Sequence, residues 1–209
     1  MAAIAASQTA MAAIIGNSTA LNAVVSSSTA MAAVAASYVA VAAVYGSAVA
    51  VDAVKANETA WATLTGATSA VMGKAVAVLS GLNPDSYADM TAVASSSTAM
   101  TAVASSNTAR TAITNSATAK NALASSPLKK TVTKGNGNSW ENRTIRNGMG
   151  WLINCYNANS GGEAGSTWYK LDGVQTSQPA GTTNVGKFFT SSLAIYWWSS
   201  TSSVTYIPC

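Results

Sequence analysis

The chain has 209 residues, 11 of them Lys or Arg and seven Asp or Glu, which gives a net charge of +4, with no histidine and two cysteines. This composition excludes a Ser-His-Asp triad, a Cys-His dyad, an imidazole metal site and a tetrathiolate zinc site. It also leaves few carboxylates for paired acid–base catalysis. We therefore expect a protein that is not an enzyme and that binds no metal or cofactor.

Alanine supplies much of the apolar content. The hydrophobic fraction is 49%, but only two residues are Phe, and an alanine side chain buries little area. A single chain with so few large apolar side chains would offset little of its ordering entropy. The composition therefore favours an oligomer, in which neighbouring chains supply the missing burial.

A ten-residue repeat fills most of residues 1–126. Clear copies are QTAMAAIIGN, STALNAVVSS and STAMAAVAAS in 8–37, and STAMTAVASS, NTARTAITNS and ATAKNALASS in 97–126. Positions 3 and 6 are usually Ala, position 4 is often Met, and position 7 is branched or long. Positions 3, 4 and 7 share one face of a helix, whereas strand alternation does not fit them. The repeat therefore predicts helices.

Each block also carries signals for the start and the end of a helix. Ser or Thr opens most blocks, as N-cap residues do, and Gly16, Gly46 and Gly66 stand at position 9, where a helix end favours glycine. A ten-residue stripe would drift by about 80° per repeat around a continuous helix. We expect short helices of about two turns, wound as a solenoid or intertwined between chains, with one long helix as the alternative.

The segment 71–86 interrupts the repeat. It contains Gly73, Gly81 and Pro84, and the blocks on its two sides are out of phase by one residue. Glycine and proline of this kind predict a kink, a loop or a change of packing.

Positions 4 and 7 are predicted to form the seam of a homotrimer. Small alanines beside them would let backbones approach, and the larger side chains would fill the seam, as core residues rather than a cofactor site. The predicted seam residues are Met11, Ile14, Met31, Val34, Met100 and Val103.

The two ends of the repeat region differ from its middle. Arg110 and Lys120 replace Met at position 4 in the last two blocks, so we expect that face to open to solvent. Met1 falls at position 4 of a partial block, so either the first repeats dock on a partner or the chain is a piece of a longer product. The stretch 30–51 carries no charge, but its Ala, Val, Ser and Gly would insert weakly into a bilayer, so we expect no membrane insertion.

A second domain is expected after the repeats. Pro127 ends the last block, 127–139 is interpreted as a basic linker, and 140–209 has strand composition, so it predicts a small β-rich tip. The fold class is therefore α+β, a helical repeat arm followed by a β tip. Cys155 and Cys209 could form a bridge, but free thiols are favoured because nothing indicates an oxidising compartment.

Aromatic residues of the tip are candidates for receptor binding. Trp and Tyr stack on sugar rings and anchor interfaces, and the predicted binding residues are Trp168, Tyr169, Tyr196, Trp197 and Trp198. The alternative is that most of them form the core. Alternation along a strand places Trp197 and Trp198 on opposite faces, so one should be buried and the other exposed. The net charge of the tip is compatible with an ordinary solvated surface, and no nucleic-acid partner is expected.

The blocks STAMAAVAAS and STAMTAVASS resemble Ala/Ser/Thr-rich repeats in fibre proteins of tailed bacteriophages, and so does the layout of repeats followed by a β-rich tip. The resemblance covers residues 1–126. It implies a homotrimeric fibre on the head or tail of a virion, assembled in the host cytoplasm. It also implies that the N-terminal part contacts capsid or tail proteins and that the tip contacts a glycan or protein of the host surface.

The leading hypothesis is thus a structural virion fibre whose tip adsorbs to the host. The alternative is a capsid decoration or cementing protein, whose repeats attach to the virion and whose tip only trimerises. A third hypothesis is a glycan-degrading tip that uses Glu141, Glu163 or Asp172, which would need two carboxylates about 5–10 Å apart in a groove.

Overall fold

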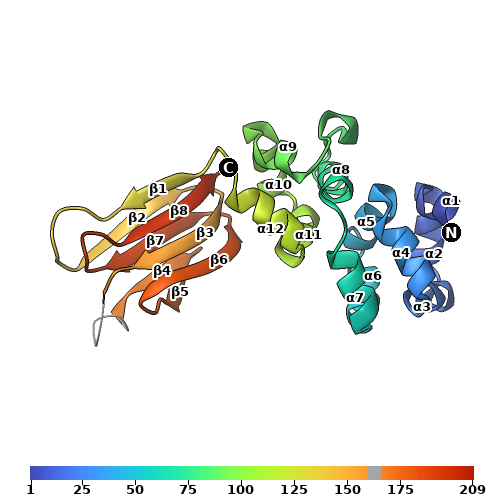
Figure 1. The fold of residues 1–209 in the computed structure, drawn as a ribbon, viewed down its shortest axis with the longest axis horizontal. Helices are drawn as coiled ribbons and strands as arrows, with labels where there is room; N and C mark the ends of the chain where they lie inside the picture. Colours follow the sequence, from blue (N-terminus) through green and yellow to red (C-terminus); the bar gives the residue numbers. More distant parts are fainter. Residues whose placement is uncertain (160–165) are drawn as a thin grey trace. The chain divides into compact units, whose positions relative to one another are not determined.

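The computed structural model describes residues 1–159 and 166–209, which divide into two compact units, Met1–Leu123 and Ala124–Cys209. The first unit is helical and the second consists of antiparallel β-sheets (Figure 1). The predicted α+β class, with helices first and a β tip after them, is confirmed. The two units are described separately.

The repeats form short separate helices, so the single long helix is excluded. Most have eight residues and are followed by a two-residue link. No single described helix is long and apolar enough to span a membrane. Only two bent pairs of described helices reach that length and composition together, Ser28–Ala35 with Tyr38–Tyr45 and Glu58–Thr65 with Ser69–Leu79. The helices before the break are α1 (Ala2–Ala5), α2 (Gln8–Ile15), α3 (Ser18–Val25), α4 (Ser28–Ala35), α5 (Tyr38–Tyr45), α6 (Ala48–Lys55) and α7 (Glu58–Thr65). The later helices are α8 (Ser69–Leu79), the 3-10 turn η1 (Pro84–Ser86), α9 (Met90–Ala94), α10 (Ser97–Ser105), α11 (Asn107–Asn115) and α12 (Ala117–Ala124).

These helices wind into a solenoid in which three repeats complete one coil. The chain bends by 100° between α4 and α5, and helices three apart in the chain contact each other: α1 with α4, α2 with α5, α3 with α6, α4 with α7 and α5 with α8. The Ser37 hydroxyl donates to the carbonyl oxygen of Ala5, 32 residues earlier, at 2.6 Å. Of the two arrangements left open by the repeat, this chain forms the solenoid, with its own coils stacked on one another.

The caps lie one residue earlier than the sequence predicted. Ser27, the last residue of its block, caps α4: its hydroxyl oxygen accepts from the Ala30 N–H at 3.2 Å. The predicted cap Ser28 is the first helical residue. An N-cap oxygen accepts from the N–H of the residue three positions later. In these helices that residue is the alanine at position 3 of the block, so the cap is the last residue of the block before. Gly16 lies at a helix end as predicted, but its φ of −72° is right-handed, and Ala36 takes the equivalent place after α4.

Neighbouring coils of one chain bury the predicted seam residues. Ile14 is half-buried, and the other five are at most 2% exposed: Met11, Met31, Val34, Met100 and Val103. The expectation that other chains must supply this burial is therefore wrong. Stacking three-helix coils allows alanines to pack closely, so few large side chains are needed inside the unit.

The predicted interruption is a change of packing. Helix α8 is longer than the repeat helices and is followed by η1 and the short helix α9. Gly73 of α8 lies directly against the start of α9, where a Cβ would be 2.6 Å from the Cα of Asp89. Asp89 caps α9, because its Oδ1 accepts from the Ala92 N–H at 2.8 Å. The second set of repeats starts from this contact, which accommodates the one-residue change of phase.

The second unit is a sandwich of two four-stranded sheets. Their orders are β1-β8-β3-β6 and β2-β7-β4-β5, and every neighbouring pair is antiparallel. This arrangement of eight strands is that of a jelly roll. The strands are β1 (Lys130–Thr133), β2 (Glu141–Asn147), β3 (Gly150–Asn157), β4 (Trp168–Leu171), β5 (Val174–Ser177), β6 (Gly181–Phe189), β7 (Ser192–Trp197) and β8 (Ser203–Pro208).

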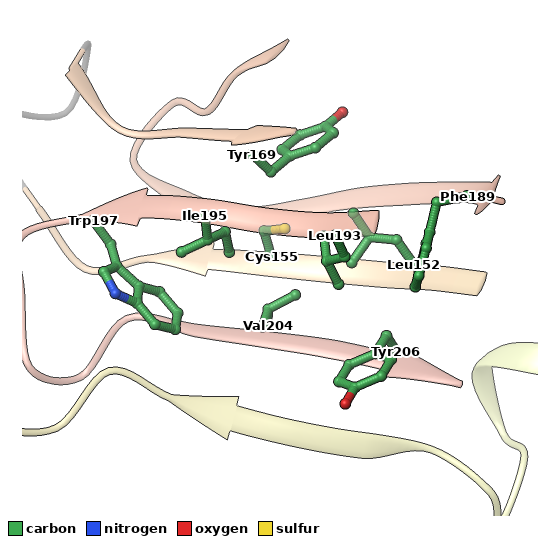
Figure 2. Packing of buried hydrophobic residues seen from close by; sticks show 9 residues of the cluster. All are labelled: Leu152, Cys155, Tyr169, Phe189, Leu193, Ile195, Trp197, Val204 and Tyr206. Carbon is green, nitrogen blue, oxygen red and sulfur yellow. The ribbon is translucent and has the colours of Figure 1, made fainter. Parts of the chain in front are cut away.

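The core of the sandwich comes from residues of strands in both sheets. Figure 2 shows the side chains of β7 directed toward those of β3 and β8. Strand β7 alternates strictly between buried and half-buried residues, whereas a bulge between Leu152 and Asn154 interrupts the alternation of β3, in which several consecutive residues are buried. The core cluster consists of Leu152, Cys155, Tyr169, Phe189, Leu193, Ile195, Trp197, Val204 and Tyr206.

Both cysteines are free, as favoured from the sequence. Cys155 lies in the core, whereas the backbone of Cys209 bonds to Met149 at 3.0 Å, six residues before Cys155. Six residues of strand span about 20 Å, whereas a disulfide joins Cα atoms at most about 7 Å apart. Burial raises the pKa of the Cys155 thiol to about 12, so this thiol stays protonated at neutral pH.

Two parts of the predicted boundaries are wrong. The predicted linker 127–139 contains β1, which pairs with β8, so the tip begins before residue 140. The segment 176–184, TSQPAGTTN, has the Pro, Gly and Ser content that predicts an exposed loop, but it contains the end of β5 and the beginning of β6. All three strands, β1, β5 and β6, lie at sheet edges, where polar and glycine-containing sequences are tolerated because one side of the strand faces solvent.

Candidate functional site

Four aromatic side chains gather on the outer face of the β2-β7-β4-β5 sheet. Trp168 of β4 and Tyr196 of β7 are directly opposite each other in the strand register, and Asn142 of β2 opposes Tyr196 from the other side. Trp140 comes just before β2 and Trp198 just after β7. All four aromatic side chains are half-buried. We call Trp140, Trp168, Tyr196 and Trp198 the aromatic row.

The rings of the aromatic row stack across neighbouring strands. The ring centroids of Trp168 and Tyr196 are 5.3 Å apart with planes at 19°, and those of Tyr196 and Trp140 are 4.8 Å apart at 9°. Trp198 is tilted against Trp140 at 5.5 Å and 59°. The Lys170 ammonium lies 4.5 Å from the Trp168 ring at the other end. Such pairs stabilise a sheet by about 0.5–1.5 kcal/mol each beyond their buried area.

Two loops hold the Trp140–Trp198 end of the row in place. The Ser139 N–H donates to the carbonyl oxygen of Trp198 at 3.1 Å, and the Asn138 side chain accepts from the Ser200 N–H at 3.0 Å. The buried Lys134 ammonium donates to the carbonyl oxygen of Gly137 at 2.8 Å, inside the same loop. Because several bonds fix both loops, the aromatic side chains at this end have a defined position.

The row combines apolar ring edges with polar neighbours. Because the rings stack on one another, each inner ring has its faces covered and presents edges outward, together with indole and hydroxyl groups. Lys170, Gln175 and Ser177 lie beside the row on β4 and β5 in the strand register. An amphipathic surface of this composition can bind a glycan or a peptide segment through ring edges and hydrogen bonds.

The structure separates the predicted binding residues into two groups. Trp168, Tyr196 and Trp198 belong to the aromatic row. Tyr169 is 4% exposed and Trp197 is 1% exposed, both in the core, so the prediction that these two contact a receptor is wrong. The expectation that Trp197 and Trp198 lie on opposite faces, one buried, is confirmed.

Two residues of this site, Trp140 and Lys170, are not among the predicted binding residues. Trp140 precedes its strand, where alternation along the strand gives no guide to its direction. Lys170 is two residues after Trp168, and that spacing on one strand could have placed it on the same face.

The described carboxylates of the tip do not form a catalytic pair. Glu141 opposes Trp197 in the register, whereas Asp172 follows Leu171, which opposes Leu193. Trp197 and Leu193 are four residues apart on β7, which corresponds to about 14 Å along the strand. This distance exceeds the separation of the two carboxylates that a glycosidase needs. Glu163 lies outside the described residues.

Asp172 instead links two turns. It occupies the β4–β5 hairpin with a positive φ of 52°, as type I′ turns require. Its carboxylate accepts hydrogen bonds from the backbone N–H groups of Thr190, Ser191 and Ser192 and from two hydroxyl groups, at 2.7–3.1 Å. Desolvation acts to raise its pKa, but these hydrogen bonds outweigh it and lower the pKa to about 2.

Replacing Asp172 should therefore weaken the sandwich in a pH-dependent way. A carboxyl whose pKa is about 2 when folded and about 3.9 when unfolded stabilises the fold above pH ~4, and this contribution is lost as the pH falls toward ~2. We expect Asp172→Ala to lower the free energy of unfolding by about 1–2 kcal/mol at neutral pH, a value kept small because the site is exposed.

Urea unfolding of the tip at several pH values measures this effect. Gln175→Ala, an exposed change in the same hairpin, is the control and should change stability by less than about 0.5 kcal/mol. Equal stability of Asp172→Ala and the wild type at pH 7 would contradict the assigned role.

No protein-family model matches the chain, and no curated protein is significantly similar to it. Among the described residues, no group of three or more His, Cys, Asp or Glu side chains could hold a metal ion. The aromatic row is therefore interpreted from its geometry alone.

Proposed function

We propose that this protein is a structural, non-enzymatic fibre protein of a tailed-bacteriophage virion. In this proposal the helical solenoid is a spacer and the jelly-roll unit is a tip that binds a glycan or protein of the host surface. The observation that carries the proposal is the half-buried aromatic row on the outer face of a small sandwich, which follows a unit built of repeats in the sequence. Solenoid units extend by adding coils, which suits a spacer whose length can vary.

The tip is the part suited to specific binding. Solenoid surfaces here consist mainly of Ala, Ser and Thr, whereas the outer face of the β2-β7-β4-β5 sheet concentrates Trp and Tyr beside Lys and Gln. Such side chains dominate recognition surfaces. Jelly rolls also serve as lectin and viral capsid domains, although this analogy concerns fold alone.

The homotrimer in this proposal is supported by the resemblance to phage fibres. The six predicted seam residues do not add to that support, since one chain already covers five of them. Contacts of the N-terminal repeats with capsid or tail proteins and a location in the virion rest on the same resemblance. Mass measurement in solution tests the trimer directly, and a stable folded monomer would contradict it.

A binding experiment with a point variant tests the role of the tip. We expect the purified chain to bind a panel of bacterial cell-surface polysaccharides or cells, and Trp168→Ala to weaken that binding at least tenfold. Tyr156→Ala is the matched control because Tyr156 is an exposed aromatic residue of the other sheet, and its binding should equal that of the wild type.

Thermal unfolding of both variants checks that the sandwich stays folded. Equal binding of Trp168→Ala and the wild type would contradict a binding role for the aromatic row. In assembled particles that carry Trp168→Ala, loss of adsorption without loss of particle stability would favour the fibre hypothesis. Loss of particle stability alone would favour the capsid decoration hypothesis.

A further inference from the structure

The outer face that carries the aromatic row has two levels of residues that cross all four strands of the sheet. The first level consists of Asn142, Tyr196, Trp168 and Ser177, and the second of Thr144, Ala194, Lys170 and Gln175. Lys170 is the only charged residue at these described positions. The charged residues Glu141 and Arg143 of β2 lie on the inner face instead, because they oppose core residues of β7 in the register.

The ammonium group of Lys170 is held in position without being neutralised. It lies 4.5 Å from the centroid of the Trp168 ring, a cation–π contact that places a charge at the end of the row without pairing it to an anion. The ion pair found among the described residues joins Lys74 and Asp85, in the helical unit. Asp172 is two residues after Lys170, but its carboxylate accepts hydrogen bonds from the turn before β7. The ammonium can therefore bind an anionic group of a ligand.

The uncharged residues of the second level suit a ligand rich in hydroxyl groups. Thr144 and Gln175 are exposed, and the small Ala194 lies between Thr144 and Lys170. The two levels are two residues apart along each strand, which is about 7 Å. A polymer that crosses the strands along the aromatic row would place its apolar edges on the rings and its hydroxyl groups beside the second level.

We propose that Lys170 makes the aromatic row selective for anionic glycans, whose sugar residues carry carboxylate or phosphate groups. The proposal rests on the binding role of the row given under the proposed function. An anionic oxygen accepts charge-assisted hydrogen bonds from an ammonium group. The charge of the tip acts in the same direction, because residues 124–209 contain seven Lys or Arg and three Asp or Glu.

A single cation on the outer face suits a polymer whose charges are well separated. An acidic peptide with carboxylates on successive residues would leave most of them without a partner on this face, and it is therefore the poorer ligand.

Matched pairs of polysaccharides test the selectivity. The probes are polygalacturonate and alginate, each beside its neutral methyl ester, and phosphomannan beside the mannan left after removal of phosphate. We expect the full chain to bind an anionic polymer about fivefold or more tightly than its neutral counterpart at low salt. The difference should shrink at about 0.5 M salt, because exposed charges are then screened. Comparison of the uronate and phosphate pairs shows which anionic group is preferred.

Variants of Lys170 separate its charge from the charge of the tip as a whole. We expect Lys170→Gln to bind the two members of each pair equally and Lys170→Arg to keep the preference. Lys187→Gln is the matched control, because it removes the same charge from an exposed residue of β6 in the other sheet, and it should behave like the wild type. Thermal unfolding checks that each variant is folded.

Three outcomes would overturn the proposal. Equal binding of charged and neutral polymers by the wild type, or a preference that survives Lys170→Gln, would remove the role of Lys170 and leave the row as a binding surface. Absence of binding to all of these anionic polymers would do the same, and the comparison of Trp168→Ala with the wild type on bacterial cells decides separately whether the row binds. Binding of polyglutamate as tightly as polygalacturonate would overturn the assignment to glycans.

Discussion

Gly73→Ala is expected to destabilise the helical unit by about 3 kcal/mol, the upper end of the usual cost of overpacking. The added Cβ would overlap backbone atoms of Asp89, and backbone cannot rotate away as a flexible side chain does. Helix propensity acts in the opposite direction, since alanine in a helix is favoured over glycine by about 1 kcal/mol. The overlap is the larger effect, because relieving it requires α8 and α9 to separate.

Urea unfolding followed by far-ultraviolet circular dichroism measures this change on the helical transition. Gly16→Ala is the control, because Gly16 has a right-handed φ of −72° and Ala36 occupies the equivalent place two repeats later. Its stability should stay within about 0.5 kcal/mol of the wild type. Equal stability of Gly73→Ala and Gly16→Ala would show that α8 and α9 do not pack as described.

Met31→Lys is expected to cost about 4 kcal/mol or more and to unfold part of the solenoid. Met31 is 1% exposed at position 4, between coils. Removing its buried side chain costs about 2–5 kcal/mol, and a buried ammonium without a partner adds to that cost or shifts its pKa to lose the charge. The reverse change at the same repeat position, Lys120→Met, should alter stability by less than about 1 kcal/mol, because Lys120 is exposed.

Comparing these two variants by thermal unfolding tests whether position 4 is buried at Met31 and open to solvent at Lys120. A loss of stability larger for Lys120→Met than for Met31→Lys would contradict this assignment. Hydrogen exchange adds a local measure, because the loss of protection in Met31→Lys should be greatest in α4 and in the helices that contact it, α1, α3, α5 and α7.

The helices could be predicted because the repeat combines several local signals. A polar cap residue, alanines and a branched residue recur at the same spacing, and each favours a short helix with a defined start. The position of the cap was off by one residue, since Ser and Thr occur at both the last and the first places of a block, as at Ser27 and Ser28. Only backbone geometry distinguishes which of two adjacent hydroxyl groups accepts the N–H of Ala30.

The candidate site was predicted in part for a similar reason. Alternation along β7 separates Tyr196 and Trp198 from Trp197, which the structure confirms. Tyr169 was misassigned because the direction of an alternating strand depends on which face meets the other sheet. Trp140 joins Tyr196 from a segment more than 50 residues away through strand pairing, and long-range register cannot be derived from either segment alone.

The sequence by itself determined the α+β division, the short helices, the break near Gly73 and the absence of histidine chemistry, because these depend on local spacing and composition. Only the tertiary structure decided that one chain stacks on itself, that the sandwich is a jelly roll, and that four aromatic residues form one row. Those features depend on which distant segments meet. A periodic pattern of small residues fits a partner coil from the same chain or from another equally well, whereas contacts between helices three apart, as between α4 and α7, appear only in the folded chain.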